Sequence, residues 1–133
     1  MLKLAAFVVR GRPFSVRASA ASRNRWREEI GLVARDVFSE PLQDNDLRIQ
    51  ITFFFDRAPS FDIDNISKPI CDALNGIAYN DDEQLVERNA RRKDIGGSYS
   101  LEDVEPELVA ALADLQKFVC IELFKVGEEI TQL

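Results

Sequence analysis

The run from Leu47 to Asp56 restricts the fold more than any other stretch, because it alternates apolar and mostly polar side chains. Successive side chains of a β-strand point to opposite faces, so a period of two predicts a strand. One face of this strand is entirely apolar: Leu47, Ile49, Ile51, Phe53 and Phe55. Phe54 interrupts the other face, which holds Arg48, Gln50 and Thr52, and we expect it to pack under a helix.

Strands and helices are predicted to alternate along the rest of the chain. Three further stretches are apolar and β-prone enough to be strands: Leu2–Val9, Gln84–Lys93 and Phe118–Val126. Three others repeat apolar residues at helical spacing: Ser22 or Asn24 to Glu40, Asp64 or Asn65 to Gly76, and Pro106 to Lys117. The order β-α-β-α-β-α-β predicts an α+β fold with a mixed sheet. A chain of 133 residues is expected to form a single domain over 1–133.

An acidic stretch follows the strand at Leu47–Asp56 and reads F-D-I-D-N-I-S-K-P-I-C-D-A-L-N-G-I-A-Y-N-D-D-E over residues 61–83. Asp62 and Asp64 are two positions apart, so on an extended backbone both carboxylates point to the same side. Asp64 or Asn65 can cap the helix, and Pro69 is expected to fall close enough to the helix start to be tolerated.

The helix after Asp64 separates an apolar stripe from a charged face. The stripe contains Ile66, Pro69, Ile70, Ala73, Leu74 and Ile77. Asp64, Lys68 and Asp72 follow one another at intervals of four on the opposite face. Gly76 is placed to close the helix. If the chain folds back there, Asp81 and Asp82 come level with the first acidic pair.

A cluster of carboxylates is unfavourable unless a cation neutralises it, because negative charges within about 4–6 Å raise each other's pKa. Ligation by oxygen alone suits Mg²⁺, or Mn²⁺, rather than zinc. One or two such ions with a nearby lysine provide the groups needed for phosphodiester hydrolysis. Plainer interpretations stay open for each part of the motif. Asp62-x-Asp64-Asn65 can be only a helix cap, and Asp64, Lys68 and Asp72 can form ordinary i, i+4 ion pairs on a solvated face. Asp81-Asp82 can be a turn.

The pattern D-I-D-N-x-x-K-x-x-x-D-A-L-N-G, followed by N-D-D-E-Q-L-V, resembles the RusA family of Holliday-junction resolvases, small Mg²⁺-dependent endonucleases. The resemblance implies that Asp62, Asp64 and Asp82 hold the metal and that Lys68 is the catalytic lysine. Asp72 and Asp81 match further acidic positions and are assigned a supporting role. The predicted enzyme is a homodimer whose two sites nick opposite strands of branched DNA, a four-way junction.

The net charge of −6 argues against nucleic-acid binding, which normally rests on a basic surface. The charge is unevenly divided, however: residues 1–35 carry eight basic and two acidic side chains, a surplus of +6, so the remainder carries −12. A basic face can therefore meet phosphate on an acidic protein. The arginines expected there are Arg10, Arg12, Arg17, Arg23, Arg25, Arg27, Arg91 and Arg92. A solvated surface is the alternative interpretation of these arginines.

Two other functions stay open. A non-catalytic DNA-binding relative would keep the motif for stability alone. A metal-dependent phosphoesterase acting on nucleotides or single-stranded nucleic acid would fit the acidic net charge.

The remaining features favour a cytoplasmic protein without a membrane span. Cys71 and Cys120 lack the spacing of metal ligands and are expected to be reduced and structural. No stretch approaches the ~20 apolar residues that a membrane helix needs. The opening Met1–Val9 lacks the basic region and cleavage site of a signal peptide.

Overall fold

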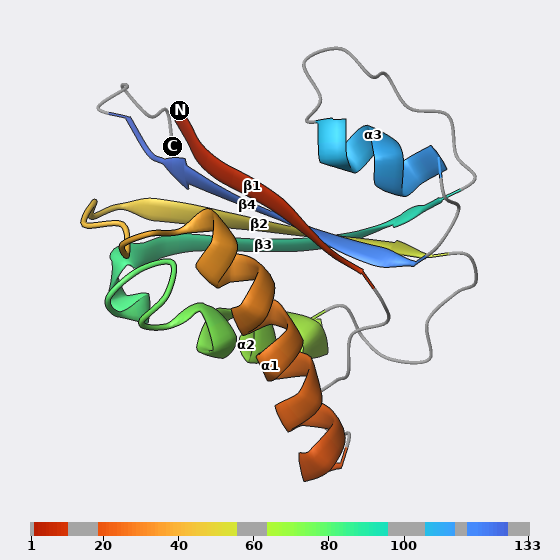
Figure 1. Ribbon diagram of the computed structural model, residues 1–133. Coiled ribbons are helices and arrows are strands. Elements are labelled where there is room, and N and C mark those ends of the chain that lie inside the picture. Colours follow the sequence, from red (N-terminus) through yellow and green to blue (C-terminus); the bar gives the residue numbers. More distant parts are fainter. Residues whose placement is uncertain (1, 11–18, 56–63, 96–105, 114–116, 128–133) are drawn as a thin grey trace.

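The structure is a computed structural model that describes residues 2–10, 19–55, 64–95, 106–113 and 117–127 (Figure 1). The elements in chain order are β1 Leu2–Arg10, α1 Ala20–Val37, β2 Leu47–Phe55, α2 Asp64–Leu74, the 3-10 turn η1 Asp82–Gln84, β3 Leu85–Asp94, α3 Pro106–Ala113 and β4 Phe118–Lys125. They form a small α+β domain with a mixed four-stranded sheet, as predicted. None of the helices in these ranges is long and apolar enough to cross a bilayer.

The sheet has the strand order β1-β4-β2-β3. β4 pairs antiparallel with both β1 and β2, whereas β2 and β3 are parallel. A parallel pair requires a crossover, and α2 lies in the connection from β2 to β3. Leu85 is therefore level with Leu47, at the end of the sheet where β2 begins. This register places Asp81 and Asp82, which come just before Leu85, at the same end of the sheet.

Helices α1 and α2 cover one face of the sheet, and α3 covers one end of the other face (Figure 1). The main core joins Ile49 and Ile51 of β2 to Trp26 of α1 and Leu74 of α2, all fully buried. The described members of the predicted apolar stripes lie in this core or pack against it, except Val37. The burial of α1 and α2 against β2 fixes the charged face of α2 toward solvent.

The second face of β2 is buried rather than solvated. Gln50 and Thr52 are both nearly inaccessible, and each accepts a hydrogen bond from an arginine: Gln50 Oε1 from Arg48 (3.0 Å) and Thr52 Oγ1 from Arg91 (2.9 Å). Phe54 stacks on Phe118 with ring centroids 4.5 Å apart, and both belong to a second apolar cluster with Ala111 of α3. The prediction that Phe54 packs under a helix is confirmed.

The predicted ends of α1 need correction. Ser19, ahead of the predicted Ser22 or Asn24, caps the helix, because its backbone is not helical and its Oγ accepts a hydrogen bond from the Ser22 N–H (3.2 Å). The helix stops at Val37, ahead of Glu40-Pro41, where the Phe38 N–H makes the closing bond to the Ala34 carbonyl. The helical spacing of the apolar residues predicts that Val37 is in the core, but as the last helical residue it is 41 % exposed.

Helix α2 begins at Asp64, so Pro69 lies inside it and not near its first turn. Pro69 has no N–H for the hydrogen bond made at an interior position, but its ring is buried on the apolar side of the helix. Gly76 follows the helix end with φ +84°, and its N–H donates to the Tyr79 carbonyl (2.8 Å). Closure of the helix by Gly76 is therefore confirmed.

Candidate functional site

The outer face of α2 presents the charged pair that its spacing predicts. Lys68 Nζ lies 3.5 Å from Asp72 Oδ2, one helical turn away. Arg27 of α1 approaches the same oxygen at 3.8 Å, so Asp72 is shared by cations from two helices. The Lys68 side chain is 72 % exposed, and such surface pairs contribute little stability. Lys68 can therefore turn from Asp72 to an incoming anion at small cost.

The second acidic pair lies in a closed turn ahead of β3. Asp81 is the N-cap of η1, and its Oδ1 accepts the Glu83 N–H (3.3 Å). Gln84 completes a capping box, because its Oε1 accepts the N–H groups of Asn80 (2.8 Å) and Asp81 (3.1 Å). A hydrogen bond with the Asp82 side chain, assisted by the Glu83 N–H, lowers the pKa of Asp81. The acidic pair is thus a folded turn, and Asp81 is ionised at neutral pH.

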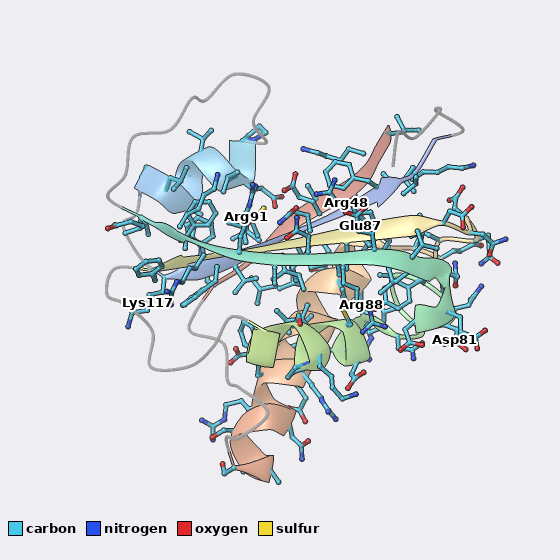
Figure 2. All side chains as sticks on the ribbon, turned by 180° about the vertical axis from the view of Figure 1, so that it is seen from behind. Arg48, Asp81, Glu87, Arg88, Arg91 and Lys117 are labelled. Atoms are coloured by element: carbon cyan, nitrogen blue, oxygen red, sulfur yellow. The ribbon has the colours of Figure 1, made fainter. Side chains whose placement is uncertain are left out.

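Asp82 is held by a cation from the adjoining strand. Its Oδ2 lies 3.3 Å from Nη2 of Arg88, and both side chains are partly open to solvent. Figure 2 shows Arg88 on the α2 side of β3, and Glu87 and Arg91 on the other side. Burial raises the pKa of Cys71 and of Tyr79, and Arg88 is close enough to both to oppose part of that rise. The Asp82 carboxylate is therefore accessible to a metal ion, and the Arg88 guanidinium already lies beside it as a counter-charge.

A buried tyrosine ties this turn to α2. The Tyr79 hydroxyl donates to the Cys71 carbonyl at 2.6 Å, and the Tyr79 side chain is fully inaccessible. Burial is the main cause that raises the pKa of Tyr79 and of the Cys71 thiol. Both groups are therefore neutral at physiological pH. Cys71 and Cys120 are both buried and form no disulfide, in agreement with the prediction that they are reduced and structural.

The two acidic segments of the motif adjoin opposite ends of α2. Asp64 is the first residue of this 11-residue helix, and η1 comes after its last turn. At about 1.5 Å per residue, the two ends of α2 are roughly 15 Å apart. Figure 1 shows α2 running back along the sheet toward the end where β3 begins. The second acidic pair therefore lies near the C-terminal part of α2 rather than level with its start.

The convergence of the acidic side chains stays a prediction. Asp62 is outside the described residues, and the side chain of Asp64 is not described either. Among the described side chains, no three of the His, Cys, Asp and Glu type come together as a metal site. The structure does bring Lys68 beside Asp72, and Asp82 beside Asp81.

The arginines expected to bind DNA lie on several elements. Arg12 and Arg17 are outside the described residues, and the side chain of Arg23 is not described. Arg10 at the end of β1, Arg25 and Arg27 on α1, and Arg92 on β3 are exposed.

Consecutive residues of a strand face opposite ways, so Arg91 and Arg92 cannot grip the same phosphate from one side. Arg91 Nε donates to Thr52 Oγ1 (2.9 Å) on the α3 side of the sheet. Arg88 and Arg92 therefore share the α2 side of the edge strand β3, next to the turn that holds Asp82.

Sequence reasoning missed the supporting roles of Arg88, Tyr79 and Gln84. The spacing Asp81-x-x-Gln84 is a capping-box pattern and could have identified Gln84. Tyr79 and Arg88 carry no comparable local signal, because their partners depend on how α2 and β3 pack.

Comparison with protein families gives one clear result. The family model described as endodeoxyribonuclease RusA matches residues 8–102. This range includes both acidic pairs, Lys68 and Asp72, together with the arginines of α1 and β3. A comparison with curated proteins finds no significant match.

Proposed function

Because this chain belongs to the RusA family of Holliday-junction resolvases, we propose that it is a Mg²⁺-dependent endodeoxyribonuclease that resolves four-way DNA junctions by paired nicks. The observation that carries the proposal is the family match, which covers every acidic residue of the motif and its lysine. The accessible carboxylate of Asp82 and the exposed ammonium of Lys68 agree with this chemistry.

The donor atoms that this chain offers fit a hard divalent cation. The sequence contains no histidine, and both cysteines are buried, so carboxylates are the ligands available at the surface. Oxygen ligands favour Mg²⁺, with Mn²⁺ as a substitute. Asp62, Asp64 and Asp82 would hold the ion. When bound, the ion activates water and stabilises negative charge on the scissile phosphate.

The remaining motif residues act on the substrate and on the ligands. Lys68 places its ammonium beside the scissile phosphate and offsets the charge that develops there. Asp72 holds Lys68 and Arg27 on the outer face of α2 until DNA replaces it as their partner. Asp81 keeps the turn that presents Asp82 closed.

We further infer that each metal site takes ligands from two subunits. Two oxygens on one Mg²⁺ ion are at most about 4 Å apart, since each lies 2.0–2.1 Å from the metal. The ends of α2, which adjoin the two acidic segments, are separated by roughly 15 Å. Asp62 and Asp64 of one subunit would therefore act with Asp82 of the partner subunit. A two-fold homodimer then has two identical sites, one for each strand to be cut.

The basic residues supply the attraction to DNA. The surplus of +6 in residues 1–35 is divided evenly among β1, residues 11–18 and α1 up to Arg35, at +2 each. Arg25 and Arg27 of α1 and Arg88 and Arg92 of β3 lie on elements that flank α2. Phosphates bound along both elements would bring the scissile bond to Lys68. Binding should weaken steeply as salt rises.

The proposal is tested by the cleavage of a synthetic four-way junction. Wild-type protein should cut the junction in Mg²⁺ and should stop when EDTA is added. Duplex and single strands of the same sequence should be cut far more slowly. Asp82→Asn and Lys68→Ala should each reduce cleavage at least ~100-fold, because removing a group that acts in the transition state costs about that much.

The competing functions give different results in the same assay. A non-catalytic relative would bind the junction equally well with and without EDTA and would cut nothing. A phosphoesterase for single-stranded nucleic acid would cut the isolated strands as fast as the junction. Either result would reject junction resolution as the function.

A further inference from the structure

The side-chain amide of Gln84 makes four hydrogen bonds, which use its whole bonding capacity. Its Oε1 accepts the N–H groups of Asn80 and Asp81, at 2.8 and 3.1 Å. Its Nε2 donates to the carbonyls of Leu42 (2.8 Å) and Asp44 (2.9 Å). A primary amide has two acceptor sites and two donors, so no further bond is available to it.

These four bonds join two segments that are distant in sequence. Asn80 and Asp81 begin the turn that carries Asp82, whereas Leu42 and Asp44 precede β2, about 40 residues earlier. One additional side-chain contact joins the same segments: Asn80 Nδ2 donates to Gln43 Oε1 at 2.9 Å. Gln84 thus fixes the backbone on the N-terminal side of Asp82 against the loop that leads into β2.

Asp82 is fixed from its other side as well. Gln84 and Leu85 continue directly into β3, which pairs with β2 over its whole length. The Asp82 carboxylate is also paired with Arg88 of β3, at 3.3 Å. A ligand must be held within about 0.5 Å of its productive position, and this depends on the groups that support it.

We propose that Gln84 is a positioning residue for Asp82, and that its amide keeps the turn in the place where Asp82 can bind the divalent cation. This rests on the proposed function of Asp82. Gln84 itself touches neither metal nor substrate. Groups that orient metal ligands typically contribute about 10- to 100-fold to metal affinity.

The substitution Gln84→Glu separates positioning from electrostatics. A carboxylate at this place keeps both acceptor bonds but loses both donors, and its second oxygen faces the carbonyls of Leu42 and Asp44. The added negative charge alone would strengthen the binding of a cation. Loss of the anchoring bonds would move Asp82 and weaken the binding of the cation. A positioning role and a purely electrostatic effect therefore predict opposite changes in cation affinity.

The experiment measures Mn²⁺ binding by isothermal titration calorimetry, with the full-length protein and without DNA. Gln84→Glu and the uncharged Gln84→Met should each weaken Mn²⁺ binding by about 10- to 100-fold. Gln43→Glu is the matched control, because it adds the same charge to the neighbouring loop without touching the Asp81 N–H. It should leave the affinity unchanged or slightly higher. Thermal unfolding of every variant is followed by circular dichroism.

The results separate the two proposals. Unchanged or tighter binding by Gln84→Glu, or a loss of binding that accompanies loss of the fold in both Gln84 variants, would overturn the positioning role. Asp82→Asn is measured beside them. If Asp82→Asn binds Mn²⁺ like the wild type, the proposed function of Asp82 fails. If it loses Mn²⁺ while folded Gln84 variants retain it, only the role of Gln84 fails.

Discussion

Replacing Tyr79 by Phe removes one buried hydroxyl and leaves the aromatic ring in place. The hydroxyl donates to the Cys71 carbonyl at 2.6 Å, in the last turn of α2. Helix geometry would assign that carbonyl to the Asn75 N–H, but Asn75 donates instead to Asp72. Tyr79 thus serves as a side-chain cap for a carbonyl at the helix end.

The loss of this bond leaves the Cys71 carbonyl with a buried, unsatisfied lone pair. Such a group costs about 1–3 kcal/mol, and removing the desolvated hydroxyl offsets part of the cost. We therefore expect Tyr79→Phe to lower the free energy of unfolding by about 1–2 kcal/mol. Unfolding entropy is about 2.1 cal/mol/K per residue, so for this chain the Tm should fall by roughly 4–7 °C.

Urea unfolding at pH 7, followed by circular dichroism, measures the change in free energy, and calorimetry gives the Tm. Val86→Ala is a suitable control, because Val86 is an exposed residue of β3 and should change stability by less than ~0.5 kcal/mol. A Tyr79→Phe protein as stable as the wild type would show that the hydroxyl is not needed as a cap.

Three further predictions concern pH, the second core and DNA. Burial raises the pKa of Cys71 and Tyr79 above their ordinary values of 9.0 and 10.0. At alkaline pH the unfolded chain therefore loses protons that the native state keeps. Urea unfolding should show the free energy of unfolding falling as the pH rises through 9 to 10 and beyond. Phe54→Ala, which removes the ring stacked on Phe118, should cost about 3 kcal/mol in the same assay. Arg25→Ala should weaken junction binding and reduce the slope of log K against log salt by about 1, measured by fluorescence anisotropy.

Features that depend on local periodicity could be predicted from the sequence. Strand β2 and the apolar stripes of α1 and α2 follow from side chains that repeat at two or about 3.6 residues. The Lys68–Asp72 pair follows from the same geometry. The cap of α1 lies at Ser19 and not at the predicted Ser22 or Asn24, because the helix begins about two turns ahead of Trp26, where its apolar stripe starts.

Features that depend on long-range pairing could not be predicted. Nothing local indicates that β3 pairs parallel to β2, yet this register puts Asp82 near the C-terminal part of α2. The Arg88–Asp82 contact and the bonds of Gln84 to Leu42 and Asp44 depend on the same pairing. The burial of Gln50 also depends on side chains from distant parts of the chain, which alternation along one strand does not reveal.

Mixing of inactive subunits tests the central claim that carboxylates from the two ends of α2 share one ion across a dimer. Asp64→Asn and Asp82→Asn chains, carrying different tags, are co-expressed, and the mixed dimer is purified through both tags. It should nick a four-way junction in Mg²⁺, because one of its two sites combines an intact Asp64 with an intact Asp82, whereas either variant alone is inactive. A mixed dimer as inactive as the two parent variants would contradict the account.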